Sequence, residues 1–392
     1  NDEILMTAFS HGGHSLYGDE NYENANYSAS IVGESGVANF SKTDLDKLFS
    51  GKTVRVSPYV STYSEGFSGS AAPKDLETMM QLINLYFTSP RKDAASLESF
   101  KTRNTMLYGN LMSNPAYYFQ NEMIKILSQN NKRVGFPTAE ELVKIDLDKA
   151  FEIYGERFAD PANFTFFFVG NFKAEEIKPM LETHLASIPT IQREESWKDL
   201  GIRPPKGKLE KVINKGTDPK SQVSINYKGE AKYSKEESYI LSSLGEVMTN
   251  RLIDLIREEK SGVYGVGANG YISERPYENY TFSISFPCGP ENVAELKKAV
   301  YEEIELIKKE GLTEEDLNEI KEAQKIDRKE SLKENRYWLN QLSAYYSYDR
   351  DLTDFFEYEK QVEDLTTKDL QEAAKKYLVE DNLIEIVLMP EE

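Results

Sequence analysis

The sequence contains few of the residues that form disulfides or bind metals. It has one cysteine, Cys288, which excludes an internal disulfide, and three histidines. No apolar run approaches transmembrane length. The net charge of −19 argues against a nucleic-acid partner, because phosphate binding requires clustered lysine and arginine. What remains is a globular chain of 392 residues, long enough for two domains that each bury a core.

The histidines do not form a known metal-binding motif. A zincin places two histidines and a glutamate on one helical face, in the order H-x-x-E-H or its inverted form, and neither order surrounds a histidine here. His11-Gly-Gly-His14 resembles a metal clip, but Gly-Gly predicts a flexible, solvated turn without a third ligand. His184 is expected to pack or lie exposed on a helix. We therefore predict no metal ligands in this chain. No Ser-His-Asp, Cys-His-Asn or glycine-rich phosphate motif is present either.

Two halves of the sequence follow one pattern. A helix at 146–154 leads through a polar loop into a hydrophobic strand at 163–169, and 368–377 leads into 382–388 in the same way. Earlier in each half, a predicted hairpin precedes a helix: 53–63 and 67–71 before 74–87, and 263–271 and 280–286 before 292–309. The pattern predicts an α+β fold, a tandem repeat of two homologous domains, each a mostly antiparallel sheet packed against helices. The domains are expected at 1–191 and 209–392, joined by a proline- and charge-rich linker at 192–208.

The first repeat lacks a strand that the second one has. The second begins with a strand at 209–214, a turn at 216–219 and a strand at 222–227. The first begins at 4–9, which corresponds to the second of these strands only. We therefore expect a fragment cut inside the first hairpin of a longer polypeptide, with residues 4–9 at or near an exposed sheet edge.

Residues 250–264 bring two chemically useful side chains together. Ser234 and Glu237 predict a helix start, and Leu241, Leu244, Met248, Leu252 and Leu255 mark one buried helical face. Ser261-Gly262 predicts the end of this helix, and a strand is expected from Val263. Arg257 in the last turn and Tyr264 in the strand can then project into one space. Arginine offers a rigid fork of donors and tyrosine one directed hydroxyl, so the pair could grip a peptide main chain.

Ordinary structure also explains both residues. The helix dipole favours arginine in a last turn, and tyrosine is common in strands. The 24 tyrosines could also indicate a surface module that binds carbohydrate or peptide. However, Tyr117, Tyr118, Tyr345 and Tyr346 are expected in helices, where aromatic packing is the commoner role.

The segment NRLIDLIREEKSGVYGVGA resembles the signature of the non-catalytic C-terminal half of pitrilysin/insulinase-family enzymes, the inverted zinc metallopeptidases. Segments 10–20, 48–93 and 336–351 resemble, in order and spacing, the two C-terminal domains of large bacterial members. The resemblance implies that Arg257 and Tyr264 bind substrate and that Tyr264 also takes part in catalysis. Zinc, its activated water and the general base would come from a zinc-binding N-terminal half or a separate catalytic subunit.

Further expectations follow from the resemblance. The chain alone should hold no cofactor and be inactive, whereas the complete enzyme should contain zinc and cleave peptides. The bacterial periplasm or cell envelope is favoured over the cytoplasm. The alternative is a structural or scaffold subunit of the same fold, against which the intact Arg257 and Tyr264 argue.

Overall fold

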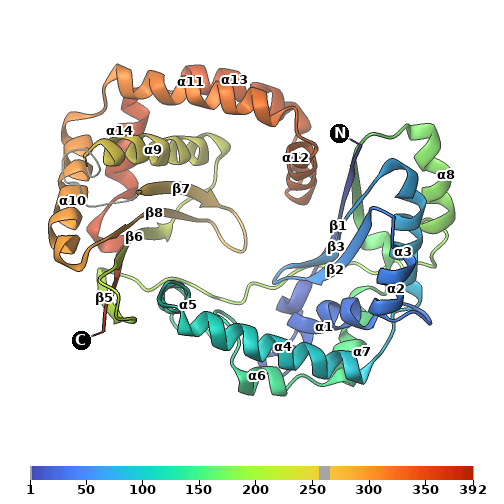
Figure 1. The fold of residues 1–392 in the computed structure, drawn as a ribbon. Coiled ribbons are helices and arrows are strands. Elements are labelled where there is room, and N and C mark those ends of the chain that lie inside the picture. The colour runs from blue at the N-terminus through green and yellow to red at the C-terminus, as the bar shows by residue number, and fades with distance from the viewer. Residues whose placement is uncertain (1, 256–264, 392) are drawn as a thin grey trace. The chain divides into compact units, whose positions relative to one another are not determined.

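The computed structural model describes residues 2–255 and 265–391 and divides the chain into two compact units (Figure 1). Unit 1 comprises Asn1–Gly109, Pro137–Leu200 and Lys329–Leu352. Unit 2 comprises Asn110–Phe136, Gly201–Arg328 and Thr353–Glu392. Each unit thus includes a segment from the other predicted domain, because one helix of each repeat packs on the sheet of the other.

A four-stranded antiparallel sheet forms the centre of unit 1. Its strand order is β2-β3-β1-β4, with bounds β1 (Ile4–His11), β2 (Val54–Val60), β3 (Ser64–Ala71) and β4 (Thr165–Gly170). Alternate residues of β1, namely Ile4, Met6 and Ala8, point into one core with Phe67 of β3. The helices of this unit are α1 (Tyr22–Ser35), α2 (Lys42–Leu48), α3 (Leu76–Thr88), most of α4 (Ala94–Ser113), α6 (Ala139–Val143), α7 (Leu147–Arg157), α8 (Ala174–His184) and α12 (Asn335–Ser347).

Helix α12 covers the other face of this sheet, although it belongs to the second repeat in sequence. Its Leu339 is buried against Leu5 of β1 and Phe167 of β4. Strands β1 and β4 therefore carry apolar residues on both faces, because both faces are covered.

Unit 2 has a five-stranded sheet of order β5-β9-β6-β8-β7. Its strands are β5 (Leu209–Asn214), β6 (Ser221–Glu230), β7 (Gly267–Ser273), β8 (Asn279–Cys288) and β9 (Leu383–Met389). Val223 and Ile225 of β6 and Phe282 and Ile284 of β8 are fully buried in its core. The helices of unit 2 are α5 (Pro115–Leu127), α9 (Lys235–Ile253), α10 (Val293–Glu310), most of α11 (Glu314–Ser331), α13 (Tyr358–Asp364) and α14 (Thr367–Tyr377).

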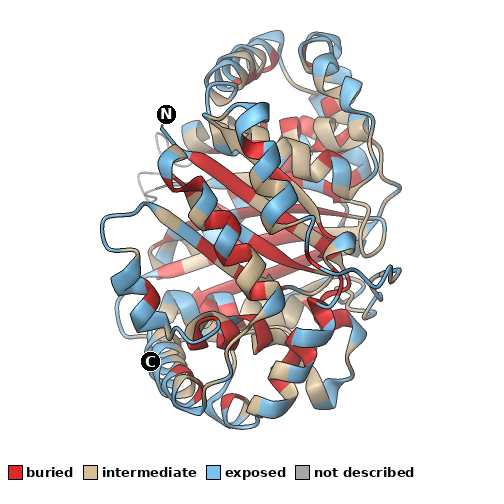
Figure 2. Cartoon of the chain, turned by 90° about the vertical axis from the view of Figure 1, so that its right-hand side faces the viewer, coloured by how far each residue is buried: buried red, intermediate tan, exposed pale blue. Residues whose placement is uncertain are grey.

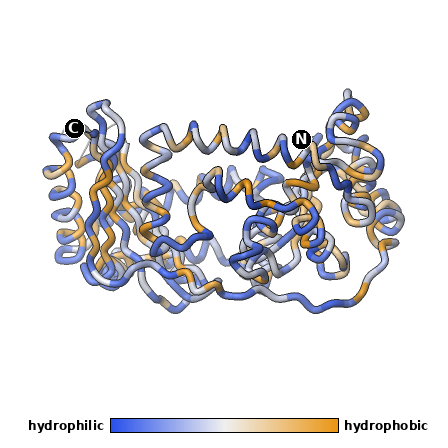
Figure 3. Tube along the Cα trace, turned by 90° about the horizontal axis from the view of Figure 1, so that it is seen from below, coloured by the Kyte–Doolittle hydropathy of each residue, from blue (hydrophilic) through white to orange (hydrophobic). Residues whose placement is uncertain are grey.

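Helix α5 comes from the first repeat and covers part of the second face of the unit 2 sheet. Its Phe119 is buried against Ile384, Ile386 and Leu388 of β9. Buried residues follow the strands while exposed residues lie on the outer sides of the helices (Figure 2). Hydrophilic and hydrophobic residues alternate along the helices (Figure 3), as expected for helices that bury one face.

The two sheets repeat one topology. The order β4-β1-β3-β2 in unit 1 matches β9-β6-β8-β7 in unit 2. The predicted α+β tandem repeat is confirmed. Within the described residues, none of the helices is long and apolar enough to cross a membrane.

The position expected for residues 4–9 was wrong. These residues form β1, which lies between β3 and β4 in the sheet interior, and the edge strand on that side is β4. The predicted hairpin at the start of the second repeat was also wrong, because β5 pairs in parallel with β9 and not with β6. Strand pairing depends on residues far apart in the chain, which the local pattern does not encode.

Three helices begin with reciprocal caps. Ser41, Thr138 and Thr313 each accept a hydrogen bond from the backbone of the acidic residue three positions on, and that acid accepts one in return.

Candidate functional site

The predicted pair Arg257 and Tyr264 lies outside the described residues. The structure describes the elements on either side of it, helix α9 and strand β7. The described part of the site is therefore helix α9 and strand β7.

Helix α9 lies directly against strand β7 (Figure 1). The Thr249 hydroxyl accepts a hydrogen bond from the Ala268 N–H at 2.9 Å and lies 3.2 Å from the Ala268 carbonyl oxygen. One glycine on the helix and one on the strand permit this close approach. A Cβ on Gly245 would come within 3.0 Å of the Asn269 Cα, and one on Gly270 within 2.4 Å of the Leu241 carbonyl oxygen.

An ion-pair network holds the last turns of α9. Arg251 pairs with Glu303 of α10 and, at 3.1 Å, with Asp316 at the start of α11. Burial opposes the charge of Arg251, but these two carboxylates outweigh it and raise the pKa of the guanidinium. Its donors are thus used within the fold. Helix α9 is thus held to α10 and α11 by Arg251 and to β7 by Thr249.

The Gly-Gly turn between His11 and His14 differs from the expected flexible, solvated turn. Gly13 has a φ of 64°, and a Cβ there would lie 2.3 Å from the Ser61 carbonyl oxygen. His14 is buried, so the turn packs tightly against the β2–β3 connection. His184 ends α8, and its ring lies 3.5 Å from Glu77.

No metal site is formed by the part of the chain that the structure describes. In residues 2–255 and 265–391, no group of three or more His, Cys, Asp or Glu side chains could hold a metal ion. These residues do not fit a zinc centre.

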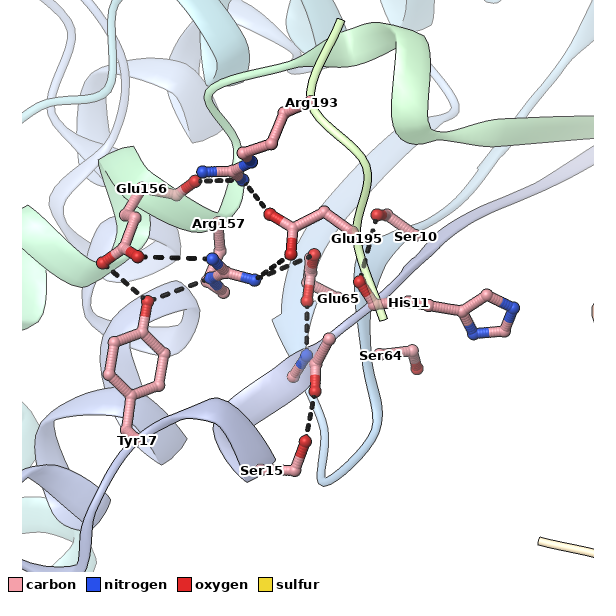
Figure 4. A network of polar contacts seen from close by, with 12 residues as sticks. Ser10, His11, Ser15, Tyr17, Ser64, Glu65, Glu156, Arg157, Arg193 and Glu195 are labelled. Atoms are coloured by element: carbon pink, nitrogen blue, oxygen red, sulfur yellow. Dashed lines mark hydrogen bonds and ion pairs between the residues drawn. The ribbon is translucent and has the colours of Figure 1, made fainter. Parts of the chain in front are cut away.

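A buried ionic cluster in unit 1 is absent from the sequence-based predictions (Figure 4). We call it the Arg157 cluster, and it consists of Tyr17, Glu65, Glu156, Arg157, Arg193 and Glu195. Arg157 Nη1 lies 3.9 Å from Glu65 Oε1 and 3.2 Å from Glu195 Oε2. Arg157 Nε donates to the Tyr17 hydroxyl at 2.9 Å, and that hydroxyl donates to Glu156 Oε2 at 2.9 Å.

Burial decides the protonation of this cluster. The side chain of Glu65 has no exposed surface, and burial raises the pKa of its carboxyl to about 7, although the Gly13 N–H, at 2.6 Å, and Arg157 oppose this. Burial also opposes the charge of Arg157, but Tyr17, Glu65 and Glu195 raise the pKa of the guanidinium. The cluster is therefore a cation held by several acceptors, one of which gains a proton near neutral pH.

The Arg157 cluster fastens the start of the predicted linker to unit 1. Arg193 pairs with Glu195, and the Arg193 backbone N–H donates to Asp160 at 2.7 Å. Farther along, the Lys198 N–H donates to the Ser15 hydroxyl at 3.0 Å. Each residue of the cluster makes a hydrogen bond or an ion pair within the fold, although Glu65 Oε1, Glu195 Oε1 and Arg193 Nε accept or donate no hydrogen bond among the described residues. These contacts indicate an anchor. The members of the cluster lie in four separate segments, so no spacing in the sequence could reveal it.

Comparison with known proteins agrees with the resemblance seen in the sequence. Residues 144–324 match the family model "Peptidase M16 inactive domain". A probable zinc protease PqqL of Haemophilus influenzae is 24% identical over 314 residues, which are 80% of this chain and 33% of that protein. A zinc protease PQQL-like of Arabidopsis thaliana is 24% identical over 366 residues, covering 87% of this chain and 35% of that protein. The chain thus spans about a third of the length of these curated relatives.

A solved structure shares the whole fold. The periplasmic protease PqqL from Escherichia coli superposes with a TM-score of 0.83 at 21% identity, covering 100% of this chain and 43% of that one. The predicted resemblance to the non-zinc half of the pitrilysin/insulinase metallopeptidases, peptidase family M16, is confirmed.

Proposed function

Residues 144–324 match the M16 inactive domain, and from this match we propose that the chain is the non-catalytic half of a zinc-dependent endopeptidase. The zinc, its activated water and the general base belong, in this proposal, to a zinc-binding N-terminal half or a separate catalytic subunit. The name and title of the PqqL relatives, a zinc protease and a periplasmic protease, support zinc in the complete enzyme and a periplasmic location.

We assign substrate binding to Arg257 and Tyr264. The observation that carries this assignment is that the pair belongs to the motif at 250–264 and is flanked by α9 and β7, which are fixed within the fold. Arg251 holds helix α9 to its neighbouring helices, and Thr249 holds it to strand β7, so the described elements that flank the pair are fixed by contacts within the fold. Rigid supports are what a substrate-positioning pair requires.

The chemistry of the two side chains gives each a role. Cleavage of a peptide bond puts negative charge on the carbonyl oxygen, and a donor fixed at that position is worth more than one in water. The Tyr264 hydroxyl is our candidate for that donor. The Arg257 guanidinium, with its rigid fork, would hold a neighbouring carbonyl of the peptide main chain. If the two side chains exchanged these roles, both would still be needed for cleavage.

Kinetics of two variants of the complete enzyme test this assignment. Tyr264→Phe removes one hydroxyl, so we expect kcat on a quenched peptide to fall by about 10²- to 10³-fold, the usual effect of losing one oxyanion donor. Arg257→Ala should raise KM and lower kcat, because it removes contacts made before and during the reaction. Zinc content and melting temperature serve as controls. Near-native kinetics in both variants, with zinc content and melting temperature unchanged, would contradict the assignment and leave Arg257 and Tyr264 without a role in the active site.

The isolated chain provides a second test. We expect no stoichiometric zinc and no peptidase activity after purification, because the zinc ligands belong to the other half. Metal analysis that finds one tightly bound zinc per chain, lost when His11 and His14 are replaced, would contradict the proposal.

A further inference from the structure

One face of the unit 2 sheet changes from apolar to polar between neighbouring strands. Under α5, strand β9 presents Ile384, Ile386 and Leu388. Directly opposite them, β6 presents Asn226, Ser224 and Gln222. The residues opposite these on β8 are Ser283, Ser285 and Pro287. Because paired residues of neighbouring strands share a face, α5 covers the apolar part and leaves a polar part beside it.

A cavity of 520 Å³ lies where the two parts meet. Phe119 and Met123 of α5 and Leu388 of β9 contribute apolar walls. Ser224 and Ser285 contribute hydroxyl groups from the polar part. A concave site with apolar walls and a few polar groups is typical of a ligand pocket, and its size suits one apolar side chain with its main chain.

Lys228 is a charged group on the same face. It lies on β6, four residues beyond Ser224 and with the same orientation, and its ammonium donates to the Thr281 hydroxyl of β8 at 3.0 Å. In the described part of the chain, no carboxylate forms an ion pair with it. Burial lowers the pKa of Lys228. A partly buried cation is normally paired, so this lysine has capacity for an anion.

We infer that this face binds an extended peptide, with an apolar side chain in the cavity and a carboxylate on Lys228. Four residues of strand span about 13 Å, so the two groups of the ligand should stand about four residues apart in an extended chain. Charge complementarity selects the carboxylate, because the Lys228 ammonium donates to a hydroxyl and pairs with no carboxylate among the described residues. The exposed hydroxyl of Ser285, at the cavity itself, can bond the peptide main chain beside the apolar side chain. The inference rests on the proposed function for the class of ligand and adds a second contact away from Arg257 and Tyr264.

Fluorescence anisotropy with the 392-residue chain tests this site without zinc or turnover. The probe is a fluorescein-labelled Gly/Ser peptide with one Phe and, four positions on, one Glu, and with an amidated C-terminus. A second peptide carries Gln in place of Glu. A third ends at that position with a free carboxylate, which separates a side-chain from a C-terminal source of the charge.

Three protein variants identify the contacts. Lys228→Met should weaken binding of the Glu peptide about tenfold, the effect of one hydrogen bond to a charged group. It should leave binding of the Gln peptide unchanged. Lys211→Met, on the edge strand β5 of the same sheet, is the matched control and should change nothing. Ser285→Tyr should fill the cavity and remove the preference for Phe over Ala in the peptide.

Either of two results would overturn the site. Equal affinity for the Glu, Gln and free-carboxylate peptides would show that Lys228 takes no anion. A loss in Lys211→Met as large as in Lys228→Met would show non-specific attraction. Unchanged melting temperatures establish that the variants fold. Failure here leaves the kinetic test of Arg257 and Tyr264 untouched, because binding to this chain and turnover by the complete enzyme are measured separately.

Discussion

At the scale of single residues, Arg157 and its partners are charged groups that lose contact with water on folding, which is unfavourable. The arginine side chain is 3% exposed, and Glu65 and Glu195 beside it are 0% and 9% exposed. Burying such charges is unfavourable unless each is paired, and the cluster pairs each one inside unit 1. Removing one member should therefore cost more than breaking a surface pair.

Replacing Arg157 is the direct test of this cost. Arg157→Met leaves Glu65 and Glu195 buried without their cation, so we expect a loss of about 3 to 5 kcal/mol in the free energy of unfolding. Urea denaturation measures it. The matched control is Arg103→Met, which breaks the exposed pair with Glu34 and should cost at most about 1 kcal/mol. Equal losses in the two variants would refute the anchor role.

Glu65 should make stability depend on pH. The pKa of its carboxyl is raised from 4.5 to about 7 in the folded state, so the folded state binds this proton more tightly than the unfolded state does. Its contribution is present below pH 4.5 and is lost as the pH rises towards 7. The difference amounts to at most about 3 kcal/mol.

Glu65→Gln removes this titration. Urea unfolding of the chain and of this variant at pH 5 and pH 7.5 should show a smaller fall in stability for the variant. A variant that loses as much stability as the unchanged chain over this range would contradict the raised pKa.

At the scale of elements, the close approach of α9 to β7 is set by glycine. A Cβ on Gly270 would lie 2.4 Å from the Leu241 carbonyl oxygen and 2.7 Å from the Phe282 ring, so backbone must shift to admit it. Gly267 of the same strand has open space around its Cβ position. The two glycines thus differ in environment although they share a strand.

We expect Gly270→Ala to destabilise unit 2 by about 3 kcal/mol through overpacking. Gly267→Ala should stay within about 0.5 kcal/mol of the unchanged chain. Thermal melts compare the two. Because α9 and β7 frame residues 256–264, Gly270→Ala should also lower turnover by the complete enzyme. A neutral Gly270→Ala would mean that the helix and strand are less closely packed than described.

At the scale of the whole molecule, the repeats exchange a helix. Phe119 lies in the first half of the sequence but is buried on β9 of unit 2, and Leu339 lies in the second half but is buried on β1 and β4 of unit 1. Each sheet therefore obtains part of its cover from the other repeat.

The exchange predicts crossed effects of two core truncations. Phe119→Ala should cost about 3 to 5 kcal/mol and speed amide hydrogen exchange in β9, whereas Leu339→Ala should cost about 2 to 5 kcal/mol and act on β1 and β4. Hydrogen exchange followed by mass spectrometry resolves the strands. Faster amide hydrogen exchange only in strands of the repeat that carries the substitution would contradict this swap of helices between the repeats.

The sequence by itself determined the local elements and the family resemblance. Apolar periodicity located the helix that became α9, and Ser234 with Glu237 marked its start, because both signals depend on residues three or four apart. The repeat and the motif at 250–264 are likewise written along the chain. The roles of Arg257 and Tyr264 stay predictions, since these two lie outside the described residues.

Only the tertiary structure decided what depends on distant residues. It put β1 inside its sheet, paired β5 in parallel with β9, and exchanged α5 and α12 between the units. It also gathered the Arg157 cluster from four segments and left Lys228 with a hydroxyl partner. Strand pairing and buried charge are settled by which surfaces meet on folding, and a local pattern in the sequence does not specify that.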